Sequence, residues 1–179
     1  KCETNGKILQ PTFDQREIQT EASNFSAVQL IMKDSYIQWT NEKAADGLTL
    51  RFSLPDSNDG KGTQGTLALF VNNSFVQNIT LNSYWAWQYI LKNGSKYPDN
   101  LPDASTKFAR MRFDEIHIKL ESKIPANAVF RFVKTDENEI PYTIDFVELE
   151  EVPEVVTFES IQDANKIAYS PENGKLQYF

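Results

Sequence analysis

The stretch TLALFVNNSFVQNITLNSYWAWQY, residues 66–89, decides the fold class of this chain. Apolar side chains alternate with smaller or polar ones on both sides of the pair Asn72-Asn73. Successive side chains of a strand point to opposite faces of a sheet, so this alternation predicts one strand on each side of the pair. Asparagine tolerates the left-handed backbone of a primed two-residue turn, and the stretch therefore predicts a β-hairpin. Four aromatic residues follow closely: Tyr84, Trp85, Trp87 and Tyr89.

The same alternation recurs along most of the chain between residues 27 and 149. Residues 47–54 are the clearest case, with Leu48, Leu50, Phe52 and Leu54 predicted to face the core. Further strands are predicted at 27–33, 35–40, 113–120, 128–134 and 142–149. Many short strands without a convincing helix indicate an all-β fold, an antiparallel jelly-roll β-sandwich.

Two stretches of the chain fall outside this strand pattern. Residues 1–26 are polar and predicted to be irregular, and 90–112 is a long connection of the kind that often carries function. Residues 1–152 are predicted to form the β-sandwich domain. Residues 153–179 are predicted to be a linker or the start of a following domain, with a short helix near 161–167.

Composition excludes several classes of function. The chain of 179 residues has a net charge of −7, which argues against a nucleic-acid partner because such proteins carry clustered Lys and Arg. No apolar run is long enough to span a bilayer. A single cysteine and a single histidine leave no material for an internal disulfide or for a zinc site built from those residues.

The order of several motifs resembles a known family. These motifs are YIQWT, LTLRFSLPD, TLALFVNNSFVQNITL, the aromatic cluster, FDEIHIKL and YTIDFVELEEV. Together they resemble a galactose-binding-like β-sandwich, and roughly residues 5–152 are similar to family 35 and family 6 carbohydrate-binding modules. The nearest likeness is to modules found N-terminal to secreted right-handed β-helix glycoside hydrolases, such as bacterial mycodextranases and other α-glucanases.

The resemblance implies a structural calcium ion as the one cofactor. Modules of this kind usually open with a strand resembling Y-E-A-E, whose acidic residues help to hold the ion, and Asp145 matches the other usual ligand. Asn5-Gly6 resembles the turn after that strand, so the expected partners of Asp145 would precede Lys1. Thr143 stands where many family 35 members carry a ligand-binding Asn, so their sugar-contacting geometry is not carried over.

Sugar binding needs an aromatic platform for the C–H faces and amide, carboxylate or guanidinium groups for the hydroxyls. The candidate ligand-binding residues are Tyr84, Trp85, Trp87, Tyr97, Asp99, Asn100, Phe113 and Asp114.

Each candidate also has a structural explanation. Trp85 and Trp87 are predicted to share one face of an extended segment, but Trp87 could instead cap the core, as strand tryptophans often do. The candidates in the long connection could be ordinary loop residues, and Phe113-Asp114 could be a solvated strand start. Trp39 alternates with core positions and is predicted to be a core residue.

The sequence predicts no catalytic residue. Glycoside hydrolysis uses a pair of carboxylates, but Asp114 and Glu115 are adjacent in a predicted strand and so face opposite ways. His117 is predicted to point outward from the same strand. The nucleophile elbow, the phosphate loop and the His-Glu-x-x-His motif do not occur. The chain is therefore predicted not to be an enzyme.

These observations predict a non-catalytic carbohydrate-binding module that targets an attached polysaccharide-degrading catalytic domain to its glycan. Its partners would be a polysaccharide or oligosaccharide, with an α-glucan implied by the resemblance, and the catalytic domain itself. The alternative is a structural module without a sugar site that docks on a neighbouring β-helix glycoside hydrolase domain. The parent protein is expected to be bacterial and secreted, at the cell surface or outside the cell.

Overall fold

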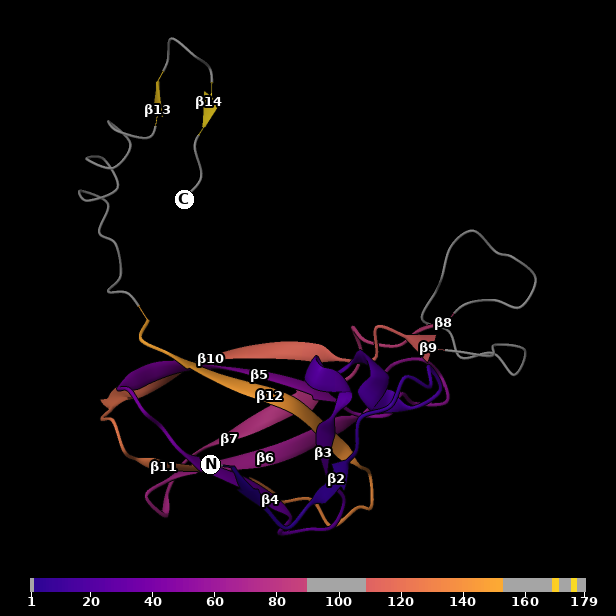
Figure 1. Cartoon of the computed structure of the whole chain (residues 1–179), viewed down its shortest axis with the longest axis horizontal. Coiled ribbons are helices and arrows are strands. Elements are labelled where there is room, and N and C mark those ends of the chain that lie inside the picture. Colours follow the sequence, from indigo (N-terminus) through magenta and orange to yellow (C-terminus); the bar gives the residue numbers. More distant parts are fainter. Residues whose placement is uncertain (1, 90–108, 153–168, 171–174, 177–179) are drawn as a thin grey trace.

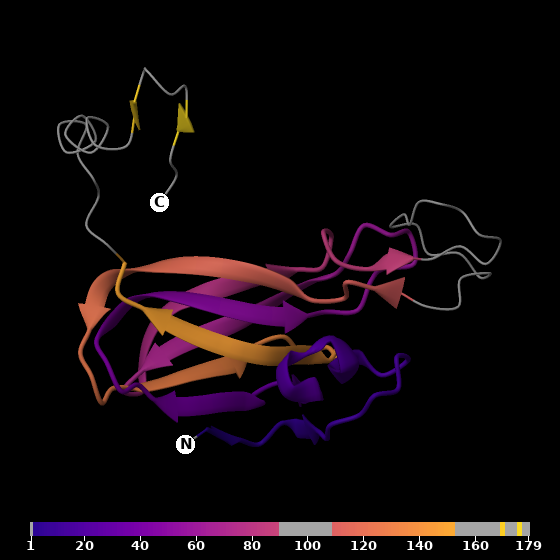
Figure 2. The same cartoon turned by 45° about the horizontal axis from the view of Figure 1, so that its top comes forward.

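The structure is a computed structural model, and it describes residues 2–89, 109–152, 169–170 and 175–176. Two five-stranded antiparallel sheets form the two layers of a sandwich (Figure 1). A tilted view shows the same layers with the N-terminal helical turns at one end (Figure 2). The predicted all-β class and the antiparallel jelly-roll β-sandwich are confirmed.

The predicted hairpin is present as β6 (Gln64–Val71) and β7 (Ser74–Asn82). Asn72 and Asn73 have φ of 49° and 64°, the pair of left-handed residues that a type I′ turn requires. The side-chain oxygen of Asn72 accepts a hydrogen bond from the backbone N–H of Val129 at 2.9 Å. The backbone N–H of Asn72 donates to the Val129 carbonyl at 2.8 Å. The turn is therefore fastened to a neighbouring strand.

The first sheet has the order β1-β4-β11-β6-β7. Its remaining strands are β1 (Glu3–Thr4), β4 (Tyr36–Thr40) and β11 (Val129–Lys134). The central strand β11 pairs with both β4 and β6, so it joins the hairpin to an early part of the chain.

The second sheet has the order β10-β5-β12-β3-β2. Its strands are β10 (Asp114–Ile124), β5 (Ala45–Ser53), β12 (Tyr142–Glu150), β3 (Ala27–Leu30) and β2 (Lys7–Leu9). The register between β12 and β5 shifts from Ile144 to Phe146, which leaves Asp145 in a β-bulge.

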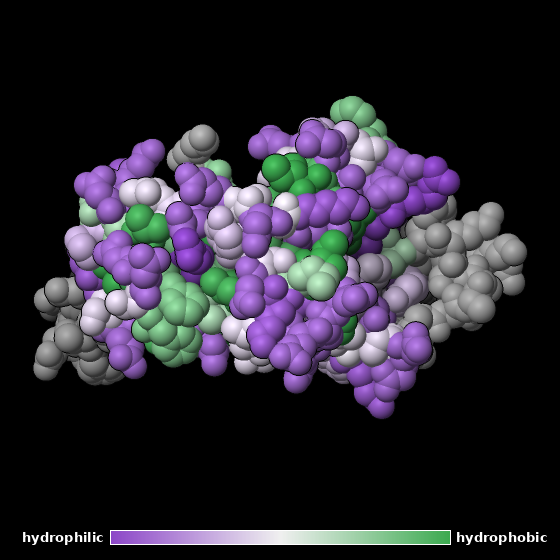
Figure 3. Space-filling view, turned by 90° about the horizontal axis from the view of Figure 1, so that it is seen from below, coloured by the Kyte–Doolittle hydropathy of each residue, from purple (hydrophilic) through white to green (hydrophobic). Residues whose placement is uncertain are grey.

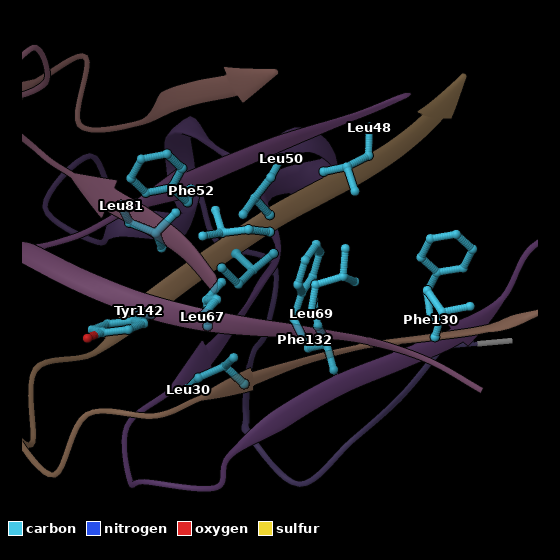
Figure 4. Packing of buried hydrophobic residues seen from close by; sticks show 14 of the residues in the cluster. Leu30, Leu48, Leu50, Phe52, Leu67, Leu69, Leu81, Phe130, Phe132 and Tyr142 are labelled. Carbon is cyan, nitrogen blue, oxygen red and sulfur yellow. The ribbon is translucent and has the colours of Figure 1, made fainter. Parts of the chain in front are cut away.

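The core lies between the two sheets and is lined by both (Figure 4). The predicted inward set of β5 and its end, Leu48, Leu50, Phe52 and Leu54, is buried. Burying one such side chain stabilises the fold by about 1.5–3 kcal/mol. The inward side chains of β5 therefore contribute a large part of the hydrophobic stabilisation of the domain. Trp39 is half-buried and packs on Phe130, with ring centroids 5.7 Å apart, at the margin of this core.

The beginning of the chain is more ordered than its sequence predicted. The short strands β1 and β2 flank the Asn5-Gly6 turn, and a Cβ on Gly6 would lie 2.7 Å from the Gln29 carbonyl oxygen. Two 3-10 helices follow, η1 (Ile18–Glu21) and η2 (Ser23–Phe25). A strand of two or three residues is too short to show a recognisable alternation in the sequence. β1 and β2 are defined instead by their pairing with β4 and β3.

Two short ladders complete the described structure. The pairing of β8 (Gln88–Tyr89) with β9 (Ala109–Arg110) brings the ends of the long connection together. β13 (Tyr169–Ser170) pairs with β14 (Lys175–Leu176). The helix expected near 161–167 lies outside the described residues, and the domain boundary after residue 152 stays a prediction. Within the described part of the chain, no helix is long and apolar enough to cross a membrane.

Candidate functional site

A pocket of about 480 Å³ opens between the N-terminal helical turns and the segment that joins β9 to β10. Its lining includes both residues of β9, which Figure 1 shows beside β8 at one end of the sandwich. The lining residues are Gln15, Thr20, Glu21, Arg51, Ala109, Arg110, Met111, Arg112 and Phe113. Of the residues proposed from sequence, Phe113 is the one that this pocket includes.

Arg112 joins the two walls of the pocket. Its Nε donates to Glu21 at 2.9 Å, and its backbone N–H donates to the other Glu21 carboxylate oxygen at 2.8 Å. The remaining guanidinium nitrogens donate to the main-chain carbonyls of Gln15, Arg16 and Glu17 at 2.9–3.3 Å. Arg112 is only 5% exposed, and these acceptors satisfy a charge that burial would otherwise penalise. These hydrogen bonds hold the segment around Arg112 against the N-terminal helical turns.

Arg51 forms the inner side of the pocket. Its Nη1 lies 2.5 Å from Asp145 and its Nε lies 3.5 Å from Glu115, so the guanidinium stands between two carboxylates. Its guanidinium carbon also lies 5.0 Å from the centre of the Phe113 ring, within cation–π range. The pocket thus combines fixed polar groups with an aromatic ring, which is the chemistry that sugar binding uses.

Asp145 receives its partners from inside the chain. Besides Arg51, the Ser23 N–H donates to Asp145 at 2.8 Å and the Ser23 hydroxyl at 3.4 Å. These hydrogen bonds come from η2 and β5; the expectation that further calcium ligands would precede Lys1 stays a prediction.

These contacts around Asp145 do not fit a calcium site. Calcium takes six to eight oxygen ligands, whereas the nearest charged neighbour of Asp145 is a guanidinium. No group of three or more His, Cys, Asp or Glu residues that could hold a metal occurs among the described residues. The calcium ion stays an expectation of the family resemblance, whereas the described residues alone predict no effect of calcium on this chain, and a titration decides between the two.

The aromatic run is arranged differently from the sequence prediction. Tyr84 and Trp85 form a turn, and their rings meet edge to face with centroids 4.6 Å apart. Trp85 is 81% exposed, whereas Trp87 is half-buried and donates its indole N–H to the Leu54 carbonyl at 2.7 Å. The two tryptophans do not share the face of an extended segment, because the turn breaks the alternation and Trp87 has a φ of 64°.

Tyr89 ties the end of this run to the loop after β5. Its hydroxyl donates to Asp56 at 2.8 Å, and Asp56 also accepts the backbone N–H groups of Ser57 and Gly62. Burial and the Asp56 carboxylate raise the pKa of Tyr89 above its ordinary value, so its phenol stays protonated. Asp56 thus has a structural role in closing its own loop.

Asp114 is not part of the described lining of the pocket. Asp114 begins β10, where its side chain accepts the N–H of Glu115 at 2.8 Å. Tyr97, Asp99 and Asn100 lie outside the described residues.

Sequence reasoning missed the arginines of the pocket. Alternation with the inward residues Leu50 and Phe52 predicts that Arg51 points outward, and Arg112 lies in the long connection 90–112. Each pairs with a residue more than 90 positions away, and no local pattern reports such a partner.

The family model described as alpha-1,3-glucanase catalytic domain D1 matches residues 1–152. No curated protein matches the chain. Among solved structures, the chain is similar to the catalytic domain of Agl-KA, with 32% identity and a TM-score of 0.76 over 86% of this chain and 26% of that one.

Two further solved structures are similar at 23% identity. One is the catalytic domain of a GH87 alpha-1,3-glucanase in complex with nigerose, with a TM-score of 0.74 over 85% of this chain and 26% of that one. The other is the catalytic unit of a thermostable GH87 alpha-1,3-glucanase from Streptomyces thermodiastaticus strain HF3-3, with a TM-score of 0.67 over 87% and 25%. The chain spans about a quarter of the length of these structures.

These matches correct two predictions made from sequence. The chain was expected to be a non-catalytic module and not an enzyme, but its family and its structural relatives are described as catalytic domains. The alternative prediction was a structural module that docks on a separate catalytic domain. It is wrong as well, because the matched family and structures are themselves described as catalytic domains. The coarser part of the resemblance, a β-sandwich linked to α-glucanases, is confirmed.

Proposed function

This chain belongs to the family of the alpha-1,3-glucanase catalytic domain D1, and from that membership we propose that it is one domain of a larger catalytic unit that hydrolyses α-1,3-glucan. The match over residues 1–152 carries the proposal, since it covers both sheets of the sandwich and the pocket. Because the chain spans about a quarter of its structural relatives, the hydrolytic activity is assigned to the whole unit.

The substrate class follows from the same relatives. Solved GH87 catalytic domains are described in complex with nigerose and with tetrasaccharides. We extend this to α-1,3-linked glucose oligosaccharides as ligands of the unit that contains the present chain. The pocket supports this extension, because Met111 and Phe113 offer apolar surface while Gln15 and Thr20 offer hydrogen-bonding groups.

Within the enzyme, the pocket suits the holding of a glucose unit better than the transfer of a proton. Glycoside hydrolysis needs one carboxyl group to give up a proton and another to act as base or nucleophile. In the described lining, Arg112 engages the one carboxylate, Glu21, and Arg51 of the lining engages Asp145 and Glu115 beside it. We therefore place proton transfer on other residues of the unit and assign substrate positioning to this pocket.

The sequence resembles modules that precede secreted glycoside hydrolases. We accordingly propose an extracellular or cell-surface location for the parent protein.

The direct test is the release of reducing sugars from α-1,3-glucan by the intact protein, with α-1,4-glucan as the comparison substrate. We expect hydrolysis of the first and much slower hydrolysis of the second. Removal of residues 1–152 should abolish activity, with the folding of the remainder checked by circular dichroism. Full activity of a folded remainder would contradict the proposal, as would an intact protein that cleaves neither glucan.

A further inference from the structure

Two aromatic residues are exposed in the turn between β7 and β8, outside the described lining of the pocket. Trp85 is 81% exposed and Tyr84 is 39% exposed. Their rings meet edge to face with centroids 4.6 Å apart, so each ring restrains the orientation of the other. An indole held in this way leaves most of its apolar surface in water, where it can stack on a ligand.

Exposure alone does not mark a site. Single exposed apolar side chains are common on protein surfaces, and Phe13 and Phe75 are also exposed here. The face shown in the space-filling view is mostly hydrophilic, with hydrophobic residues in separate patches (Figure 3). Trp85 differs from such residues because its backbone is fixed on both sides and is connected directly to the pocket.

The backbone before the aromatic pair is fixed by the loop that follows β5. Ser83 is buried; its N–H donates to the Thr63 carbonyl at 3.1 Å, and its hydroxyl donates to the Pro55 carbonyl at 2.9 Å. The Ser83 hydroxyl also accepts the Thr63 N–H at 2.9 Å. The Asn82 side-chain oxygen accepts the Tyr84 N–H at 2.6 Å, which begins the turn. These hydrogen bonds set the direction in which the chain leaves β7.

The backbone after the pair is fixed by burial and by the segment that follows β9. Ala86 is buried, and its N–H donates to the Ser83 carbonyl at 3.1 Å, which closes the turn. The Trp87 N–H donates to the Met111 carbonyl at 3.0 Å. Trp85 therefore projects from a turn that is held at both ends, so a ligand that stacks on it loses little affinity to the ordering of the protein.

The contact between Trp87 and Met111 also connects the turn to the pocket. β8 pairs with β9 through Gln88 opposite Arg110, and the hydrogen bond from Trp87 to Met111 continues this ladder. Both residues of β9 and Met111 line the pocket. Two residues along a chain span at most about 7 Å, and a ladder pair adds about 5 Å, so the Cα atom of Trp85 lies within about 12 Å of that of Met111.

We propose that Trp85 is an outer sugar subsite of the intact catalytic unit, where the indole stacks on a glucose unit of a glucan chain that also occupies the pocket. The inference rests on the proposed function, because the chain in the pocket is the substrate. Stacking suits an exposed indole, since the C–H face of a sugar is apolar while its hydroxyls stay in water. Tyr84, which meets the indole edge to face, positions it.

The separation between the pocket and Trp85 determines which substrates gain from the subsite. Trp85 is not part of the described lining, so a sugar chain that fills the pocket reaches the indole only through further glucose units. Longer oligosaccharides therefore gain the stacking contact, and the shortest gain least. The contact lies away from the bond that is cleaved, so its benefit belongs to KM rather than to kcat.

A neighbouring protein domain is the rival occupant, because tryptophan is also enriched at protein interfaces. A stable interface buries about 800 Å² on each partner, whereas a single indole is enough to stack on a sugar. The chain neighbours of the pair, Ser83 and Ala86, are both buried, so the exposed apolar surface of the turn consists of the two rings. A surface of this size favours a sugar.

Hydrolysis of α-1,3-linked oligosaccharides of increasing length by the intact catalytic unit tests the proposal. Trp85→Ala should raise KM about five- to tenfold for the longest oligosaccharide, the effect of losing one aromatic stack, and the rise should shrink as the substrate shortens to nigerose. Trp85→Tyr keeps an aromatic ring and should recover most of the affinity. Phe75→Ala removes an exposed aromatic near the start of β7, whereas Trp85 follows its end, and should leave KM unchanged at every length.

Three results would overturn the subsite. Equal KM values for the wild type and Trp85→Ala at every length would refute it, and an equal rise at every length would show that the substitution acts through the pocket. A lower melting temperature of the intact unit in Trp85→Ala than in Phe75→Ala would assign the indole to a neighbouring domain. In each case a wild-type unit that hydrolyses α-1,3-glucan leaves the proposed function standing, whereas a wild type that cleaves no α-1,3-linked substrate refutes both.

Discussion

Arg51 and Asp145 form an ion pair with a nitrogen–oxygen distance of 2.5 Å, in which the Asp145 side chain is fully shielded from solvent. The two residues lie 94 positions apart, on β5 and in the bulge of β12. The bulge turns a carboxylate out of the strand alternation and toward the guanidinium. One pair thus links the central strands of the second sheet to the wall of the pocket.

Removing the positive member of this pair should be costly. Arg51→Met leaves Asp145 buried with only Ser23 as partner, and we expect a loss of about 3 kcal/mol in the free energy of unfolding, measured by urea denaturation. Lys61→Met is the control, since it breaks an exposed pair with Asp59 and should leave the urea midpoint unchanged. Equal losses of unfolding free energy in the two variants would show that the Arg51–Asp145 pair stabilises the fold no more than an exposed pair does.

Chelation of calcium should leave the stability of this chain unchanged. The Arg51 guanidinium supplies the positive charge beside Asp145, and the described residues around it lack the oxygen ligands that calcium prefers. Thermal melts in excess calcium and in excess chelator should therefore coincide. A melting temperature that rises with calcium would refute this reading and support the ion implied by the family resemblance.

The hairpin turn predicts opposite effects for two substitutions of Asn73. A β-branched residue is strained at positive φ, so Asn73→Val should lower the free energy of unfolding by about 1–2 kcal/mol. Asn73→Gly fits the same turn without strain and should be neutral or stabilising. Urea denaturation of both variants checks the prediction, and a stable valine variant would contradict the type I′ assignment.

Tyr142 predicts a loss of stability at alkaline pH. Burial and the hydrogen bond to Asp136 raise the pKa of Tyr142 from 10.0 to about 12. A group whose pKa is raised by folding contributes its full stabilisation below the unfolded value, and that contribution falls between pH 10 and 12 by roughly 2 kcal/mol.

Tyr142→Phe should remove the share of this dependence that belongs to Tyr142 and leave the share of Tyr89, as measured by urea denaturation from pH 9 to 12. Tyr89 has a pKa raised in the same direction and should account for part of any remainder. An unchanged pH profile in the Tyr142 variant would exclude Tyr142 as the titrating group.

Arg110 should contribute to substrate binding in the intact enzyme. It is exposed in the lining of the pocket, and among the described residues its side chain donates one hydrogen bond, to Gln15 at 3.3 Å. Arg110→Ala should raise KM for α-1,3-linked oligosaccharides about fivefold with kcat unchanged, the effect of losing one hydrogen bond of about 1 kcal/mol. Arg16→Ala, an exposed arginine paired with Asp14, should change neither constant. A fall in kcat alone would contradict a positioning role.

Patterns within a few neighbouring residues predicted the hairpin and the inward face of β5. The Asn72-Asn73 hairpin and the inward leucines of β5 follow from alternation and turn chemistry, and both are present. The turn at Tyr84-Trp85 was missed because aromatic residues favour extended chain, whereas the Asn82 side chain accepts the Tyr84 N–H at 2.6 Å and turns the backbone there.

The pocket could not be predicted for a different reason. Its walls meet through Arg51 with Asp145 and through Glu21 with Arg112, and each pair depends on the topology of the sheets. The sequence did not predict that the chain belongs to a family of catalytic domains, because it contains none of the short motifs that mark reaction centres. The family match instead extends over residues 1–152.

The position of β12 in the second sheet also governs when the domain can fold during synthesis. β12 is the last strand of the sandwich in chain order, yet it lies between β5 and β3. As the chain leaves the ribosome from its N-terminus, β3 and β5 emerge long before the strand that joins them. Leu48, Leu50 and Phe52 can pack against the first sheet once β11 has emerged, but β5 has no neighbour on its β12 side until residues up to 150 follow, so the second sheet is the last layer to be completed.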